Sequence, residues 1–73
     1  MDLPTNIQKV GENNVSYDHN DKTYIRGIDY IENKISFYET KKDQYEEGTS
    51  DWQFYENYRA FYQYIKDEYD AIP

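Results

Sequence analysis

The only histidine lies in a short polar segment whose residue types could hold a metal ion or transfer protons. Asp18, His19, Asn20 and Asp21 are consecutive, and carboxylates and imidazoles are the groups that such chemistry uses. The segment lacks the glycine and the final glutamate of an EF-hand loop, and the chain has no second histidine. Because Asp, Asn and His also tolerate tight turns, we predict a turn here and no metal site.

Nucleophilic and nucleotide chemistry is not indicated either. The chain has no cysteine, and no serine lies in a nucleophile-elbow motif, so an activated nucleophile beside an oriented base is not expected. Its three glycines, Gly11, Gly27 and Gly48, are isolated, so no glycine-rich loop precedes a helix to cradle phosphates. We predict that the protein is not an enzyme and uses no cofactor.

Carboxylates form the clearest charge pattern in the sequence. Residues 1–42 hold seven acidic and six basic residues, whereas residues 43–73 hold eight and two. The excess lies around the connection between two predicted helices and along the second helix, at Asp43, Glu46, Glu47, Asp51, Glu56, Asp67 and Asp70. Carboxylates four or seven residues apart on a helix are separated by about 6 to 10 Å, a spacing similar to that of nucleic-acid phosphates. We predict an acidic ridge that a basic groove could accept; the alternative is a solvated face that aids solubility.

Aromatic residues must supply much of the core. Ile, Leu, Val and Phe together make up only 13 of 73 residues, but the chain has ten tyrosines and one tryptophan. Most tyrosines lie at helical spacing and are expected to be buried. Trp52 and Tyr64 point away from the main stripe of the second helix, and Tyr30 and Phe37 form a second column on the first. These side chains either bind a partner or pack under the sheet.

The first 27 residues predict a small sheet. Residues 1–6 have no periodic pattern and are expected to form a flexible arm. Residues 7–27 contain short extended segments separated by turn residues, which predicts a β-hairpin or a three-stranded meander. Val15 and Tyr17 lie two apart on one strand, and Thr23 and Ile25 lie two apart on the next.

The rest of the chain predicts two helices, over residues 28–47 and 50–71. Apolar residues recur every three or four positions, and the second helix carries the stronger stripe, which begins at Phe54 and ends at Ile72. Gly48 ends the first helix, Thr49 and Ser50 supply an N-cap for the second, and Ser50 with Gln53 has the spacing of a capping box. So short a connection makes the helices antiparallel. The fold class is therefore α+β, with ββαα order, in a single small acidic domain spanning residues 1–73.

Net charge and composition limit the partners. The formal charge of −7 disfavours direct binding to nucleic acid or to an anionic membrane. The start of the chain lacks the pattern of a signal peptide, and no run of apolar residues is long enough to span a membrane. The absence of cysteine fits a reducing compartment. We expect a cytoplasmic protein, in the host cytoplasm if a virus encodes it.

Two functions remain open. In the first, the protein is an inhibitor whose acidic ridge occupies the basic nucleic-acid-binding surface of a larger protein. Small size, negative charge and aromatic richness resemble in kind the virus-encoded proteins that block restriction or CRISPR nucleases. In the second, an antitoxin-like or phage accessory protein uses its aromatic stripe to bind a partner or a second copy of itself, as a homodimer.

Overall fold

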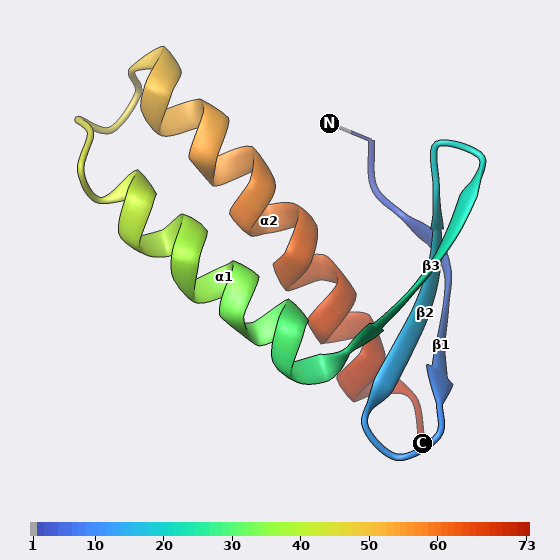
Figure 1. The fold of residues 1–73 in the computed structure, drawn as a ribbon. Coiled ribbons are helices and arrows are strands. Elements are labelled where there is room, and N and C mark those ends of the chain that lie inside the picture. Colours follow the sequence, from blue (N-terminus) through green and yellow to red (C-terminus); the bar gives the residue numbers. More distant parts are fainter. Residues whose placement is uncertain (1) are drawn as a thin grey trace.

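The computed structural model describes residues 2–73 as a three-stranded antiparallel sheet followed by two packed helices (Figure 1). The strand order is β1-β2-β3, so the sheet is the meander and not the single hairpin. The elements are β1 (Thr5–Val10), β2 (Asn14–His19), β3 (Lys22–Gly27), α1 (Ile28–Lys42) and α2 (Ser50–Ala71). The predicted α+β class with ββαα order is confirmed.

The β2–β3 turn fixes the register of the sheet. Asn20 and Asp21 both have positive φ, 52° and 64°, which is the backbone of a two-residue type I′ turn. The prediction of a turn at this polar segment is confirmed. The turn pairs His19 with Lys22, and consequently Tyr17 with Tyr24 and Val15 with Arg26.

This register places Tyr24 and Arg26 on the same side of the sheet as Val15 and Tyr17, because directly paired residues share a face. Thr23 and Ile25 therefore face away from the helices, and Ile25 is 58% exposed. Alternation along a strand defines two sets of side chains but does not say which set faces the core.

The core lies where the helices cross the central strand. Within residues 2–73 the core has five buried hydrophobic side chains, two from β2, one from α1 and two from α2: Val15, Tyr17, Ile31, Phe61 and Ile65. A backbone hydrogen bond of 2.8 Å from Ile28 N to Asn13 O ties the start of α1 to the β1–β2 turn. The sheet and the helices therefore share one core.

The first helix is shorter than predicted. It ends at Lys42, whereas the sequence pattern extended it to residue 47. Lys41 and Lys42 occupy its last turn, where positive charge is favourable, and the acidic residues that follow would oppose the negative end of the helix dipole. The chain instead leaves the helix through bonds from Gln44 N to Lys41 O and from Tyr45 N to Lys42 O.

The predicted flexible arm is partly wrong. Pro4 is buried, and Thr5 and Asn6 belong to β1. The strand is irregular between Thr5 and Gln8, and Asn6 has a φ of 53°. The Asn6 side chain donates to Asp18 Oδ2 at 3.3 Å and accepts from Gln8 Nε2 at 2.7 Å. These polar contacts fix the start of β1, which the sequence pattern could not predict because its apolar residues do not alternate.

Helix α2 has the predicted bounds, and one of its two predicted N-cap residues forms the cap. Thr49, and not Ser50, is the N-cap, and its Oγ1 accepts from Trp52 N at 3.3 Å. With the cap one residue earlier, Trp52 stands at the third helical position, so the predicted Ser50–Gln53 capping box does not form.

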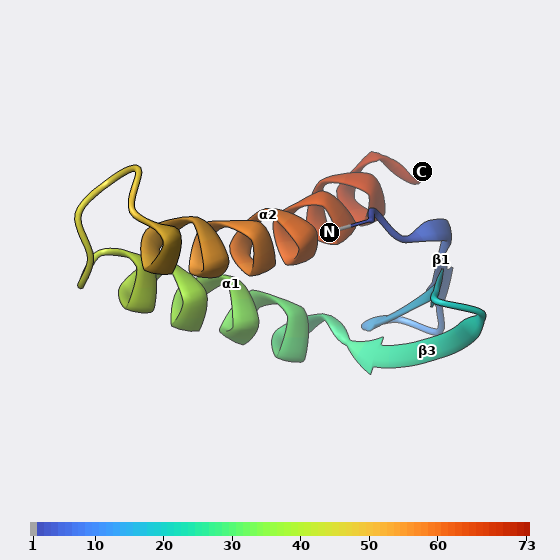
Figure 2. The ribbon, with the colours of Figure 1, turned by 90° about the horizontal axis from the view of Figure 1, so that it is seen from above.

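The helical hairpin extends well beyond the sheet. The two helices lie side by side, and the sheet stands across one end of the pair (Figure 2). The molecule measures 39 × 23 × 17 Å. Neither helix in residues 2–73 combines the length and apolar character needed to cross a membrane.

Candidate functional site

Four of the predicted partner-binding carboxylates gather at the end of the hairpin that is farthest from the sheet. Asp43 caps the C-terminus of α1, Glu46 and Glu47 lie in the connection, and Asp51 lies in the first turn of α2. We call Asp43, Glu46, Glu47 and Asp51 the acidic tip. All four are exposed, and within residues 2–73 none forms an ion pair.

Local hydrogen bonds hold the tip in shape. Thr49 donates from its backbone N–H and from Oγ1 to Glu46 O, at 3.1 and 2.7 Å. Gly48 has a φ of 91°, which strains other residues. Tyr45 stacks on Tyr55 of α2, with ring centroids 5.6 Å apart. The carboxylates thus project from an ordered connection.

The prediction that Glu56 belongs to an outer acidic ridge is wrong. Glu56 belongs instead to a neutral network between the helices. Arg59 donates from Nε and Nη2 to Glu56 at 2.6 and 2.9 Å, and Lys42 Nζ donates at 3.3 Å. Glu39 completes the network, 3.5 Å from Lys42 and 3.4 Å from Arg59. The Arg59 hydrogen bonds, opposed by partial burial and assisted by Lys42, lower the pKa of Glu56 to about 2.

The two predicted carboxylates in the last turns of α2 also have partners within the chain. Lys66 Nζ donates to Asp70 at 2.6 Å, and this bond raises the pKa of Lys66. Asp67 accepts a hydrogen bond from Gln63 Nε2 at 2.9 Å. The structure therefore leaves an acidic tip in place of a ridge that runs the length of α2.

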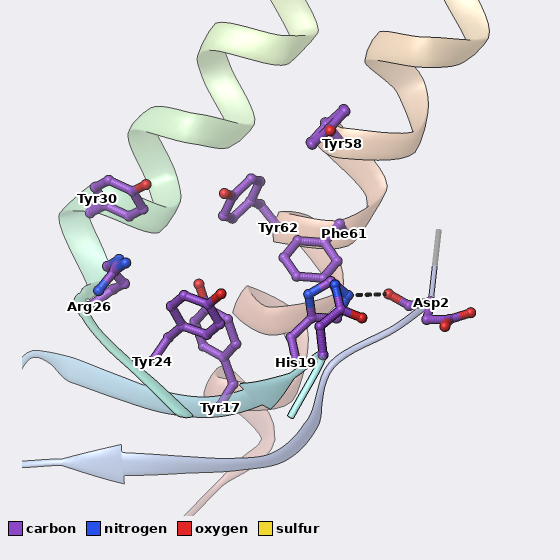
Figure 3. Close-up of a pocket in the computed structure, with 10 residues that line it drawn as sticks. Asp2, Tyr17, His19, Tyr24, Arg26, Tyr30, Tyr58, Phe61 and Tyr62 are labelled. Atoms are coloured by element: carbon purple, nitrogen blue, oxygen red, sulfur yellow. Dashed lines mark hydrogen bonds between the residues drawn. The ribbon is translucent and has the colours of Figure 1, made fainter. Parts of the chain in front are cut away.

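A pocket of about 630 Å³ opens between the inner face of the sheet and the helices, and the sequence pattern did not predict it (Figure 3). Its lining combines aromatic rings with a few polar groups: Asp2, Tyr17, His19, Asn20, Tyr24, Arg26, Tyr30, Tyr58, Phe61 and Tyr62. The rings contact one another closely. Tyr17 stacks on Tyr24 at 5.4 Å, and His19 meets Phe61 edge to face at 4.8 Å.

Comparisons with protein-family models, curated proteins and solved structures found no match.

The two predicted aromatic anchors, Trp52 and Tyr64, are half-buried and not fully exposed. Trp52 lies under Lys42, whose Nζ is 5.6 Å from the ring centroid, and Tyr64 is half-buried on α2. Other rings are more exposed. Phe37 and Phe54 are 50% and 52% exposed, although Phe54 belongs to the stripe predicted for the core. The sheet lies at the opposite end of the hairpin from the connection between the helices (Figure 1).

The polar segment that could have bound a metal is used for folding. Thr23 Oγ1 donates to Asp18 at 2.6 Å, and His19 Nε2 is 3.1 Å from Asp2 O. Within residues 2–73 no three His, Asp or Glu side chains gather as a metal site requires.

The sequence does contain a signal for the pocket. Tyr24 and Arg26 alternate on a strand opposite Val15 and Tyr17, which places an unusually polar set on the inner face.

Proposed function

We propose that the protein binds a larger protein by docking its acidic tip on a basic, nucleic-acid-binding surface, and that it inhibits this partner by competing with nucleic acid. The observation that supports this is the gathering of four exposed carboxylates at one projecting end of the hairpin. Glu56 and Asp70 are paired with cations of the same chain, whereas the four tip carboxylates are exposed and unpaired at a projecting end.

Charge and shape both favour such docking. Unpaired carboxylates keep their full attraction for a cationic surface, whereas paired ones must first exchange partners. The hairpin is narrow, because the whole molecule is only 23 × 17 Å across its shorter axes. A narrow acidic end can enter a groove that is wide enough for a nucleic-acid strand. The reducing cytoplasm suits this cysteine-free chain and contains such partners.

The experiment compares two variants of equal charge. The tip variant combines Asp43→Asn, Glu46→Gln, Glu47→Gln and Asp51→Asn. The control combines Glu12→Gln, Asp21→Asn, Glu32→Gln and Glu68→Gln, which are all exposed and lie outside the tip. Each changes the formal net charge from −7 to −3. Both are immobilised beside the wild type and exposed to lysate of the organism that encodes the protein.

We expect one or more basic proteins to be retained by the wild type and the control but lost from the tip variant. Binding should weaken steeply between about 50 and 500 mM salt, and a duplex oligonucleotide should elute the retained protein. If both four-site variants lost the retained proteins equally, binding would depend on net charge and not on the acidic tip. Retention that resists the oligonucleotide would disprove competition with nucleic acid.

Exposed rings favour a second candidate, association through aromatic contacts. Phe37 and Phe54 are half exposed, one on each helix of the hairpin, and such rings are common binding anchors. Association of this kind tightens or holds as salt rises. Sedimentation of the wild type and of a Phe37→Ser, Phe54→Ser variant at low and high salt distinguishes the two candidates.

A further inference from the structure

The pocket between sheet and helices contains a tyrosine hydroxyl that has no hydrogen-bond partner within residues 2–73. Tyr17 is only 4% exposed, and its ring is packed between Tyr24 and Phe61. Figure 3 shows the Tyr17 and Tyr24 hydroxyls pointing into the space between the sheet and the helices. No group of residues 2–73 forms a hydrogen bond with the Tyr17 hydroxyl. Because no side-chain oxygen or nitrogen in the described residues is both buried and unpartnered, this hydroxyl reaches the open space of the pocket and can bond to a molecule that enters it.

Arg26 supplies the pocket with a positive charge that no carboxylate neutralises. The chain has fifteen acidic and eight basic residues, yet within residues 2–73 Arg26 forms no ion pair. Its guanidinium lies 5.2 Å from the Tyr24 ring and 5.5 Å from the Tyr30 ring, and Nη1 donates to Ile25 O at 3.0 Å. A guanidinium has five N–H donors, so most remain available.

The other titratable groups of the pocket leave this charge unopposed. His19 Nε2 is turned to the carbonyl oxygen of Asp2, and Figure 3 shows the Asp2 carboxylate directed away from the rings. Burial raises the pKa of Tyr17 and of Tyr62, so both hydroxyls remain protonated and can donate at neutral pH. The other polar groups of the lining are the Asn20 amide and the hydroxyls of Tyr24, Tyr30 and Tyr58.

We infer that this pocket binds a small planar aromatic anion, whose ring lies among the tyrosines and whose carboxylate or phosphate meets Arg26 and the Tyr17 hydroxyl. A volume of about 630 Å³ is adequate for such a molecule. A cationic ligand fits less well, because Arg26 already occupies the faces of Tyr24 and Tyr30 and would repel it. The site is separate from the acidic tip and does not depend on the proposed docking.

Three probes of similar shape test the sign of the charge. The wild-type protein is titrated with 2-naphthoate, with 2-naphthalenemethanol and with 2-naphthylmethylamine, and backbone amide shifts are followed by NMR. We expect 2-naphthoate to bind about tenfold more tightly than the alcohol, the amine to bind most weakly, and the largest shifts to fall on residues of the pocket.

Arg26→Gln should reduce the affinity for 2-naphthoate to that of the alcohol and leave the alcohol unchanged. Lys41→Gln removes the same charge beside Phe37, outside the lining of the pocket, and should leave all three affinities unchanged. Tyr17→Phe retains the ring but removes the hydroxyl, so it should weaken the binding of 2-naphthoate only. Equal binding of the three probes, preference for the amine, or no binding at millimolar concentration would overturn the inference. These wild-type results decide it even if Arg26→Gln fails to fold.

Discussion

Glu56 is held by cations from both helices, and this explains why helix periodicity alone misplaced it. Its spacing from Asp67 and Asp70 puts these residues on one side of an isolated helix. Lys42, however, reaches it from α1 at 3.3 Å, and the Glu56 side chain is only 22% exposed. A wheel drawn for one helix does not show a partner that crosses from another helix, so the sequence identified the carboxylates but not which of them are free.

The Glu56 network makes stability depend on pH in a defined direction. The pKa of Glu56 falls from an ordinary 4.5 to about 2 in the folded protein, so its stabilising contribution is complete above about pH 5 and is lost as the pH falls through 4.5 toward 2. Glu56→Gln should therefore lower the free energy of unfolding by about 1 kcal/mol at pH 7. The difference from the wild type should vanish near pH 2, as urea unfolding at both pH values would show.

Glu68→Gln provides the control, because Glu68 is exposed and changes the net charge equally. It should shift stability by less than about 0.5 kcal/mol at either pH. If the two variants behaved alike, the network would contribute nothing to folding.

The elements differ in how clearly the sequence defines them. Helix α2 has an apolar stripe over its whole length and a capping residue before it, and its bounds were predicted correctly. The end of α1 was not, because Tyr45 continues the apolar spacing although Asp43 and Glu46 oppose the dipole. The start of β1 was missed because polar side-chain bonds define it. Local periodicity reveals elements that bury a stripe and does not reveal those fixed by a bulge or a turn.

The orientation of β3 gives a matched test of the register. Ile65→Ala removes a fully buried side chain and should cost about 2 to 5 kcal/mol, enough to unfold much of so small a domain. Ile25→Ala makes the same change on the outer face, where the side chain is 58% exposed, and should cost less than about 0.5 kcal/mol. Thermal unfolding followed by circular dichroism measures both.

Similar losses from the two alanine variants would mean that Ile25 is buried. In that case Thr23 and Ile25 would form the inner face of β3, and Tyr24 and Arg26 would face solvent. The pocket would then lose its cation and one of its rings.

Across the whole molecule, burial is concentrated at one end. All five buried core side chains lie where the helices cross the sheet, and residues 32–60 contain no buried residue. The far half of the hairpin is held by half-buried tyrosines, such as Tyr38 stacked on Tyr58 at 5.1 Å, and by the Glu56 network. We infer a gradient of local stability from the sheet to the acidic tip.

Amide hydrogen exchange should show this gradient. Amides of residues 61–66 are expected to exchange only through global unfolding, whereas those of residues 39–42 and 53–56 should exchange at least about tenfold faster. Two-dimensional NMR in heavy water resolves the individual sites. Uniform protection along both helices would contradict a gradient and would indicate that the hairpin opens only as a unit.

The position of Trp52 gives this gradient an optical consequence. The sole indole lies at the start of α2, under the Lys42 ammonium and far from the five core side chains. Its fluorescence therefore reports on the projecting end of the hairpin and hardly on the core. A melting curve recorded by tryptophan emission would follow fraying of this end, and the same unlabelled signal would respond when another molecule covers it.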